Sequence, residues 1–173
     1  DPEDGAVVAE GRAPHEVTGS GGARETDPEV WWEALRAALD QTGRAGEIGA
    51  ISVAGQQHGL VVTDADGRPL RPAVLWNDTR SAPDADRLRD EQGAEWWAEQ
   101  VGVVPVPSFT VTRWAWLKRT EPELAAATRA IRLPHDWLTE RLCGRGVSDR
   151  GDASGTGWWS TRDEDYADEV LEL

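Results

Sequence analysis

The chain is organised around a short polar turn that joins two apolar segments. Residues 48–53 and 60–62 are rich in Ile, Val and Leu, which is typical of buried β-strands. Gly55 and Gly59 flank the turn, and each lets the backbone bend, or approach a ligand closely, where a Cβ atom would obstruct. The pattern therefore predicts a strand, a polar turn and a second strand.

Three side chains in this turn can both donate and accept hydrogen bonds. They are Gln56, Gln57 and His58, and a polyhydroxylated ligand is recognised by groups of this kind. The same side chains could instead satisfy backbone groups of their own loop, as polar residues in turns commonly do. The turn alone leaves these two interpretations open.

Charge excludes two classes of partner. The 173 residues carry a formal net charge of −14, whereas nucleic acids and anionic membranes bind basic surfaces. We therefore expect no nucleic-acid partner and no membrane partner. Apolar runs are too short to span a bilayer, and the first residues resemble no signal peptide.

Cysteine and histidine usage bears on compartment and metal binding. Cys143 is the single cysteine, so no disulfide can form within the chain, and a cytoplasmic setting is expected. We expect Cys143 to be a small packed residue rather than a nucleophile. Because one Cys and three scattered His make a poor ligand set, no metal site is expected.

Strand and helix patterns alternate along the chain, which predicts an α/β domain. Strands are expected at residues 6–11, 48–53, 60–62, 69–75 and 130–133, and helices at residues 27–43, after 81, around 96–97, at 109–121, after 121 and at 134–142. Asp27 is expected to cap the first helix. Ser81 with Asp84, and Thr120 with Glu123, have the spacing of capping boxes.

A second polar turn follows the apolar residues 69–75. It contains Trp76, Asn77, Asp78 and Arg80, and open α/β sheets place ligand contacts at such strand ends. An Asp–Arg pair there can also simply brace its loop. Asp152 lies in a further polar segment, where Asp, Ser and Gly are the ordinary residues of turns, so we expect no catalytic role for it.

Seven short motifs occur along the chain in a fixed order. They are Asp27-Pro28-Glu29-Val30-Trp31-Trp32, Gly55-Gln56-Gln57-His58-Gly59, residues 70–80, Phe109-Thr110, Glu121-Pro122-Glu123, Leu133-Pro134-His135-Asp136 and Asp152-Ala153-Ser154-Gly155-Thr156. In this order they resemble the N-terminal domain of the FGGY-type carbohydrate kinases, and among these the xylulose kinases. The resemblance covers nearly the whole chain.

The resemblance implies a ribonuclease H-like α/β domain of the actin/hexokinase-type ATPase fold that lacks its first strand or strands. Residues 1–173 would be part of the sugar-binding domain of a larger enzyme, which phosphorylates D-xylulose to D-xylulose 5-phosphate with ATP. ATP and Mg²⁺ would be bound mainly by a second domain and other parts outside this chain. We expect no catalytic residue here, because the family's Asp-x-Gly-Thr and Gly-Gly-Asp-Asn turns do not occur in it.

The resemblance also implies which residues contact the sugar. Gln57 and His58 match a sugar-contacting pair, and His58 is the stronger candidate because many members have Met where this chain has Gln57. Trp76, Asn77 and the pair Asp78 and Arg80 resemble an element beside the same cleft.

Two alternatives remain open. One is a kinase for another sugar or polyol, such as ribulose, gluconate or glycerol, and the other is a non-catalytic remnant that binds sugar or a partner protein. The resembling fold pairs its first strand inside the sheet, so without it the domain would expose a sheet edge. We therefore expect self-association, for instance as a homodimer, or marginal stability.

Overall fold

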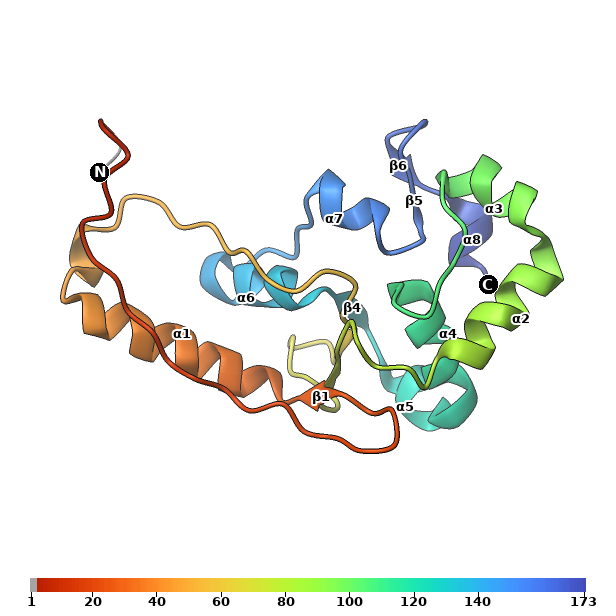
Figure 1. Ribbon diagram of the computed structural model, residues 1–173, viewed down its shortest axis with the longest axis horizontal. Coiled ribbons are helices and arrows are strands. Elements are labelled where there is room, and N and C mark those ends of the chain that lie inside the picture. Colours follow the sequence, from red (N-terminus) through yellow and green to blue (C-terminus); the bar gives the residue numbers. More distant parts are fainter. Residues whose placement is uncertain (1–2) are drawn as a thin grey trace.

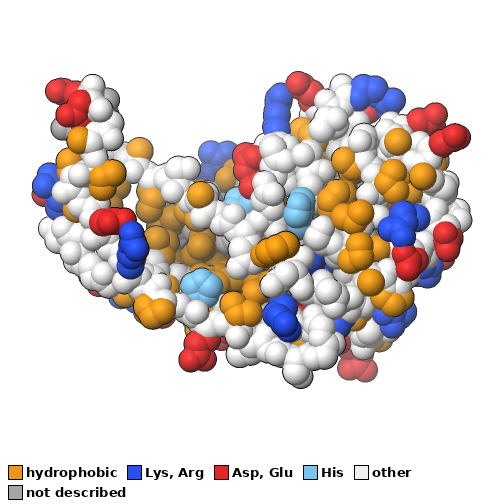
Figure 2. Space-filling model, viewed as in Figure 1, with side chains coloured by type: hydrophobic (Ala, Val, Ile, Leu, Met, Phe, Trp, Pro, Cys, Tyr) orange, Lys and Arg blue, Asp and Glu red, His pale blue; other side chains and the backbone are white. Residues whose placement is uncertain are grey.

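The computed structural model describes residues 3–173 and shows a curved arrangement of helices around short strands (Figure 1). The N-terminal segment and helix α1 (Pro28–Thr42) form one arm of the curve. The other end holds α2 (Ala82–Gln92), α3 (Ala94–Val101) and the C-terminal α8 (Asp168–Leu171). The space-filling view shows that the molecule is hollowed between these two ends (Figure 2).

The remaining elements lie between these ends. The helices are η1 (Ala45–Glu47), α4 (Thr110–Thr120), α5 (Pro122–Ala127), α6 (Pro134–Cys143) and α7 (Arg150–Ser154), and the strands are β1 (Glu25–Thr26), β2 (Val61–Thr63), β3 (Ala73–Val74), β4 (Ala130–Arg132), β5 (Trp159–Ser160) and β6 (Asp165–Tyr166). Within residues 3–173, β1 pairs with β3, β2 with β4 and β5 with β6, all antiparallel.

Strand β2 lies at the centre of the core. An isolated bridge between Leu60 and Val74 joins the β2 segment to β3. Leu60 and Val62 pack in one hydrophobic cluster and Val61 in another, as expected when successive side chains of a strand point to opposite faces. This burial on both faces fixes the position of the polar turn that precedes Leu60.

Helix α1 begins and ends as its sequence predicts. The side chain of Asp27 accepts a hydrogen bond of 3.0 Å from the backbone N–H of Glu29, and Gly43 ends the helix with a left-handed φ of 64°. Trp31 of α1 packs edge-to-face against Trp137 of α6, with ring centroids 6.5 Å apart. Burial of these large side chains holds α1 against the core.

Two predicted strands are wrong. Residues 6–11 and 48–53 contain no strand, because a strand needs a partner strand and no β-pairing among the described residues includes either segment. Val7 and Val8 are 83% and 57% exposed. The strand predicted at residues 69–75 is confirmed only for Ala73–Val74.

The two predicted capping boxes are also wrong. Ser81 occupies the N-cap position of α2, but its side chain makes no capping hydrogen bond and donates to the carbonyl of Pro107 at 2.8 Å. The Thr120 hydroxyl donates to the carbonyl of Trp116 at 2.9 Å, and Glu121 occupies the N-cap position of α5. In both cases the hydroxyl donates to a backbone carbonyl and accepts no hydrogen bond from an N–H group at the start of the helix.

Cys143 is exposed rather than packed, because it is the last residue of α6 and the chain turns away at Gly144. Across residues 3–173 the structure contains no helix with the length and apolar character required to cross a membrane.

Candidate functional site

The two polar turns meet at one cavity of about 500 Å³. It is lined by Gln56, Gln57, His58, Trp76 and Ser108. Three of the residues predicted from the sequence, Gln57, His58 and Trp76, therefore lie together, although they come from separate segments. Trp76 is 54% exposed, so its indole is open to a ligand.

His58 is the most firmly held side chain of this cavity. Its Nδ1 atom lies 2.7 Å from the carbonyl oxygen of Gly155, and because a carbonyl only accepts, Nδ1 carries the proton. The ring also packs at 5.2 Å from the ring of Phe109. Among the described residues nothing hydrogen bonds to Nε2, which leaves this nitrogen available to a hydroxyl group.

Gly155 can approach His58 only because it has no side chain. A Cβ atom at this position would lie 2.2 Å from Cε1 of His58, far inside van der Waals contact. His58 itself has a left-handed φ of 61°, which is uncommon for residues other than glycine. The contacts of the imidazole with Gly155 and Phe109 therefore fix its orientation.

Arg113 joins the two polar turns through hydrogen bonds to their backbone carbonyl groups. This α4 side chain is completely buried, and it donates to the carbonyl oxygens of His58 at 2.9 Å, Leu75 at 3.1 Å and Trp76 at 2.6 Å. Burial lowers the pKa of Arg113 to about 10, against a smaller opposing effect of the Asp78 charge. The guanidinium is therefore still charged at neutral pH.

The sequence predicted no site role for Arg113, Ser108, Phe109 and Gly155, although Phe109 and Gly155 belong to two of the seven motifs. The only signal for Arg113 was a cation on the buried face of an amphipathic helix, between Val111 and Leu117. Charged side chains are rarely buried without partners, so an Arg at such a position is expected to hydrogen bond to buried acceptors.

Asp78 and Arg80 form an ion pair outside the cavity lining. Asp78 is 2% exposed and accepts from the backbone N–H of Arg24 at 2.8 Å and from Nη2 of Arg80 at 2.8 Å. Arg80 also pairs with Glu25 and lies 4.3 Å from the ring centroid of Trp116. The pair therefore fastens the second polar turn to β1. Asn77 is exposed and does not line the cavity.

The pKa of Asp78 reflects two opposing effects. Burial raises it, but the hydrogen bonds from the Arg80 side chain and from the backbone N–H groups of Arg24 and Arg80, with the Arg80 charge, outweigh this. The pKa of Asp78 lies below its usual value as a result. Asp78 is therefore a carboxylate at neutral pH.

A second cavity, of about 400 Å³, lies between α4, β4 and the C-terminal segment. Trp114, Ile131, Trp158 and Leu171 contribute apolar surface to it. None of the six residues predicted from the sequence lines this cavity, so the cavity at His58 is the better candidate site.

Comparison with known proteins gives a consistent set of relatives. The model of the FGGY family of carbohydrate kinases, N-terminal domain, matches residues 1–173. Xylulose kinase of Streptomyces rubiginosus is 61% identical over 169 residues, covering 96% of this chain and 35% of the relative. Xylulose kinase of Streptomyces coelicolor is 62% identical with the same coverage. This chain thus spans about a third of the length of these relatives.

Solved structures agree with these matches. The crystal structure of xylulose kinase from Bifidobacterium adolescentis superposes with a TM-score of 0.86 and 35% sequence identity, covering 96% of this chain and 38% of that chain. The structure from Brucella ovis, described as a xyloylose kinase, superposes with a TM-score of 0.85 and 34% identity, covering 95% of this chain and 34% of that chain. The expected ribonuclease H-like α/β fold is confirmed by this agreement. The chain belongs to the FGGY family of carbohydrate kinases and corresponds to its N-terminal domain.

Proposed function

We propose that this chain forms the sugar-binding part of a larger, ATP-dependent kinase that phosphorylates the terminal hydroxyl of D-xylulose to give D-xylulose 5-phosphate. The names of the Streptomyces relatives, at 61% and 62% identity, support the choice of sugar. The single cysteine supports a cytoplasmic setting for this enzyme.

The observation that carries the proposal is the cavity at His58. Its lining offers two amides, one imidazole, one hydroxyl and one indole, and these groups suit a small neutral molecule with several hydroxyls. Nδ1 of His58 donates to the carbonyl of Gly155, so Nε2 is the atom that would accept a hydrogen bond from a sugar hydroxyl. The open indole of Trp76 offers an apolar surface for the carbon skeleton.

ATP and Mg²⁺ do not fit this cavity. None of the five residues that line it carries a carboxylate, an ammonium or a guanidinium group, whereas phosphoryl transfer depends on charge neutralisation and carboxylate-held metal. We propose that the nucleotide and its metal bind elsewhere in the larger protein. The part played by this chain is then to bind and orient the sugar, which by itself contributes to rate.

The other predicted residues have different parts in the proposal. Gln57 is a second hydrogen-bonding group beside His58, and Asn77 is an exposed amide next to Trp76 in the chain. Asp78 and Arg80 act through the loop, because their ion pair holds the turn that carries Trp76. We assign them to positioning rather than to direct contact.

Titration of D-xylulose into the purified protein, followed by tryptophan fluorescence, tests the proposal. We expect saturable quenching that is lost in His58→Ala and kept in His15→Ala, a matched control because His15 is exposed and outside this cavity. Trp76→Phe identifies the reporter among the ten tryptophans. D-Ribulose tests the choice of sugar.

A protein that melts cooperatively but shows no saturable response to D-xylulose would overturn the proposal for this chain. A stronger response to D-ribulose would make D-ribulose the proposed substrate, and the proposed binding site at His58 would stay the same.

A further inference from the structure

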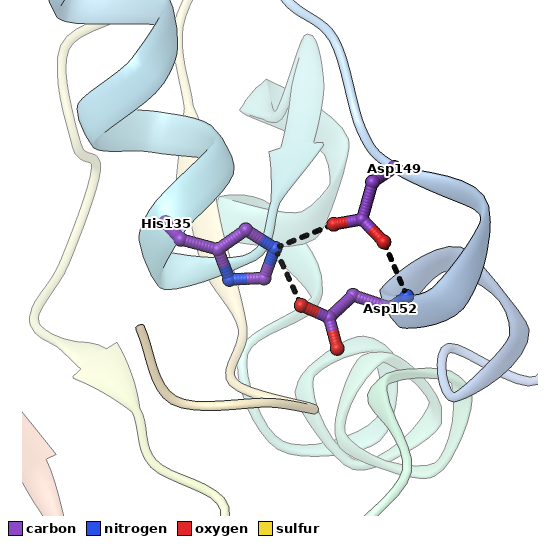
Figure 3. Close-up of side chains that lie close together, drawn as sticks. All are labelled: His135, Asp149 and Asp152. Atoms are coloured by element: carbon purple, nitrogen blue, oxygen red, sulfur yellow. Dashed lines mark hydrogen bonds and ion pairs between the residues drawn. The ribbon is translucent and has the colours of Figure 1, made fainter. Parts of the chain in front are cut away.

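His135 lies at the start of α6 and faces two carboxylates at the start of α7. Figure 3 shows one nitrogen of its imidazole pointing toward the carboxylates of Asp149 and Asp152. The Nε2 atom is 3.0 Å from Oδ2 of Asp152 and 3.7 Å from Oδ2 of Asp149. A third carboxylate, that of the neighbouring Asp136, lies 3.3 Å from the same nitrogen. One buried imidazole is thus surrounded by oxygen atoms from two separate elements.

The hydrogen bonding of this imidazole is incomplete. His135 is 4% exposed, and among the described residues neither Nδ1 nor Nε2 has a hydrogen-bond partner. The oxygens of Asp136 and Asp152 lie within 3.3 Å of Nε2 without being aligned with it for a hydrogen bond, and the oxygen of Asp149, at 3.7 Å, is too distant for one. A buried polar group without a partner costs free energy. A bound ligand that contacts Nε2 would remove this cost.

We propose that His135, Asp149 and Asp152 bind a divalent transition-metal ion of the zinc or manganese class. One ligand atom from each residue lies within 4.8 Å of the other two. Ligands bonded to one such ion at about 2.0–2.2 Å lie roughly 3 to 3.5 Å apart, and the separations of 3.0 and 3.7 Å from Nε2 are close to this range. In such a site the ion lies on the lone-pair axis of Nε2, and the carboxylate oxygens lie beside this axis. This arrangement agrees with the lack of hydrogen-bond alignment between Nε2 and the carboxylates.

The orientation of Asp149 supports the proposal. Its Oδ1 atom accepts a hydrogen bond of 3.0 Å from the backbone N–H of Asp152, so its Oδ2 atom is turned toward His135. Hydrogen bonds that orient a ligating carboxylate are a regular feature of metal sites. The Asp149 side chain is 64% exposed, which gives an ion a route from solvent.

The choice of ion follows from the ligands. Imidazole together with carboxylates suits Zn²⁺ and Mn²⁺, whereas Mg²⁺ and Ca²⁺ prefer oxygen ligands alone. The sequence-based expectation of no metal site considered only Cys and His and did not include Asp149 and Asp152, which only the fold brings to His135.

The proposed ion would join α6 to α7. Gly155 directly follows α7 and accepts the hydrogen bond from His58, so the ion would hold this acceptor in place. Binding of the ion requires no sugar, and its test is therefore independent of the proposed function.

Isothermal titration of ZnCl₂ and of MgCl₂ into chelator-treated protein, without sugar, tests the proposal. We expect saturable binding of one Zn²⁺ per chain and a preference for Zn²⁺ over Mg²⁺. His135→Asn and Asp152→Asn should each weaken Zn²⁺ binding at least about tenfold, while His15→Asn should leave it unchanged.

Asp149→Asn tests the site without changing a buried side chain, because the Asp149 side chain is 64% exposed. Asn is as good a helix N-cap as Asp, so this change removes the ligating charge and keeps the cap of α7. A loss of Zn²⁺ affinity with an unchanged melting temperature supports the site. Absence of saturable Zn²⁺ binding in the wild type, or undiminished binding in Asp149→Asn, would overturn the proposal and leave His135 as a group that only pairs with carboxylates.

Discussion

His58 Nδ1 donates a 2.7 Å hydrogen bond to the carbonyl of Gly155, which lies 97 residues further along the chain. This contact connects the first polar turn to the segment after α7, and it selects the imidazole tautomer whose Nε2 can accept a hydrogen bond. The orientation of the proposed sugar-contacting side chain therefore depends on a residue that the first polar turn does not contain.

Gly155→Ala tests this dependence. The new Cβ atom would meet the His58 ring, so the imidazole must move and D-xylulose affinity should fall about tenfold or more, equivalent to about 1.4 kcal/mol. Gly155 has a right-handed φ of −82°, so alanine is tolerated by the backbone itself. Fluorescence titration measures the affinity, and Gly46→Ala is the control because a Cβ there meets nothing within 4 Å. Unchanged affinity in Gly155→Ala would contradict the positioning role.

Arg113→Met is expected to destabilise the fold by about 3 kcal/mol, because three buried carbonyl groups lose a charged donor. Those carbonyls belong to His58, Leu75 and Trp76, so both polar turns should loosen. Urea denaturation measures the change in the free energy of unfolding. Arg36→Met is the matched control: its Glu33 ion pair is exposed, and a change below about 0.5 kcal/mol is expected. Equal effects of the two variants would show that the buried network is unimportant.

In Asp78→Asn the free energy of unfolding should change less than in wild type as the pH is lowered into the acid range. The folded-state pKa of Asp78 is lowered, so the contribution of this carboxylate is present above the unfolded pKa, near 3.8, and is lost as the pH falls through the folded pKa. The variant should be less stable than wild type by about 2 kcal/mol at pH 7.

The check is urea denaturation at a series of pH values from 7 downward. We expect the wild type and Asp78→Asn to converge only below pH 3.8. Asp66→Asn, which changes an exposed carboxylate in a surface turn, is the control. A constant difference between Asp78→Asn and wild type across the series would exclude a charge-dependent role for Asp78.

Local sequence predicted those elements that local chemistry determines. Asp27, Pro28 and Gly43 set the ends of α1 without help from the rest of the chain, and the apolar run at Leu60–Val62 identified the central strand. The strands expected at residues 6–11 and 48–53 failed because apolar composition alone supplies no hydrogen-bonded neighbour.

The candidate site divides in the same way. Gln57, His58 and Trp76 were found because polar residues follow apolar runs in the sequence and because they match the family resemblance, although the run at residues 48–53 is not a strand. Arg113 and Gly155 contribute through contacts with distant segments, and neither residue type predicts such a contact. Asp78 and Arg80 were identified as a pair, but only the structure shows that their ion pair faces β1 rather than the cavity.

Self-association is expected from the exposed apolar side chains around the hollow. Figure 2 shows hydrophobic side chains between the N-terminal arm and the rest of the molecule, and Val8 and Ile48 line a cavity of about 510 Å³ in this arm. Val7, Val8 and Ile48 are 83%, 57% and 45% exposed, and clustered exposed apolar surface favours association. Light scattering coupled to size exclusion should give a mass that rises with concentration. Combining Val8→Ser with Ile48→Ser should reduce this rise, whereas Val106→Ser, at a separate exposed position, should not. A wild type that stays monomeric at every concentration would refute the expectation.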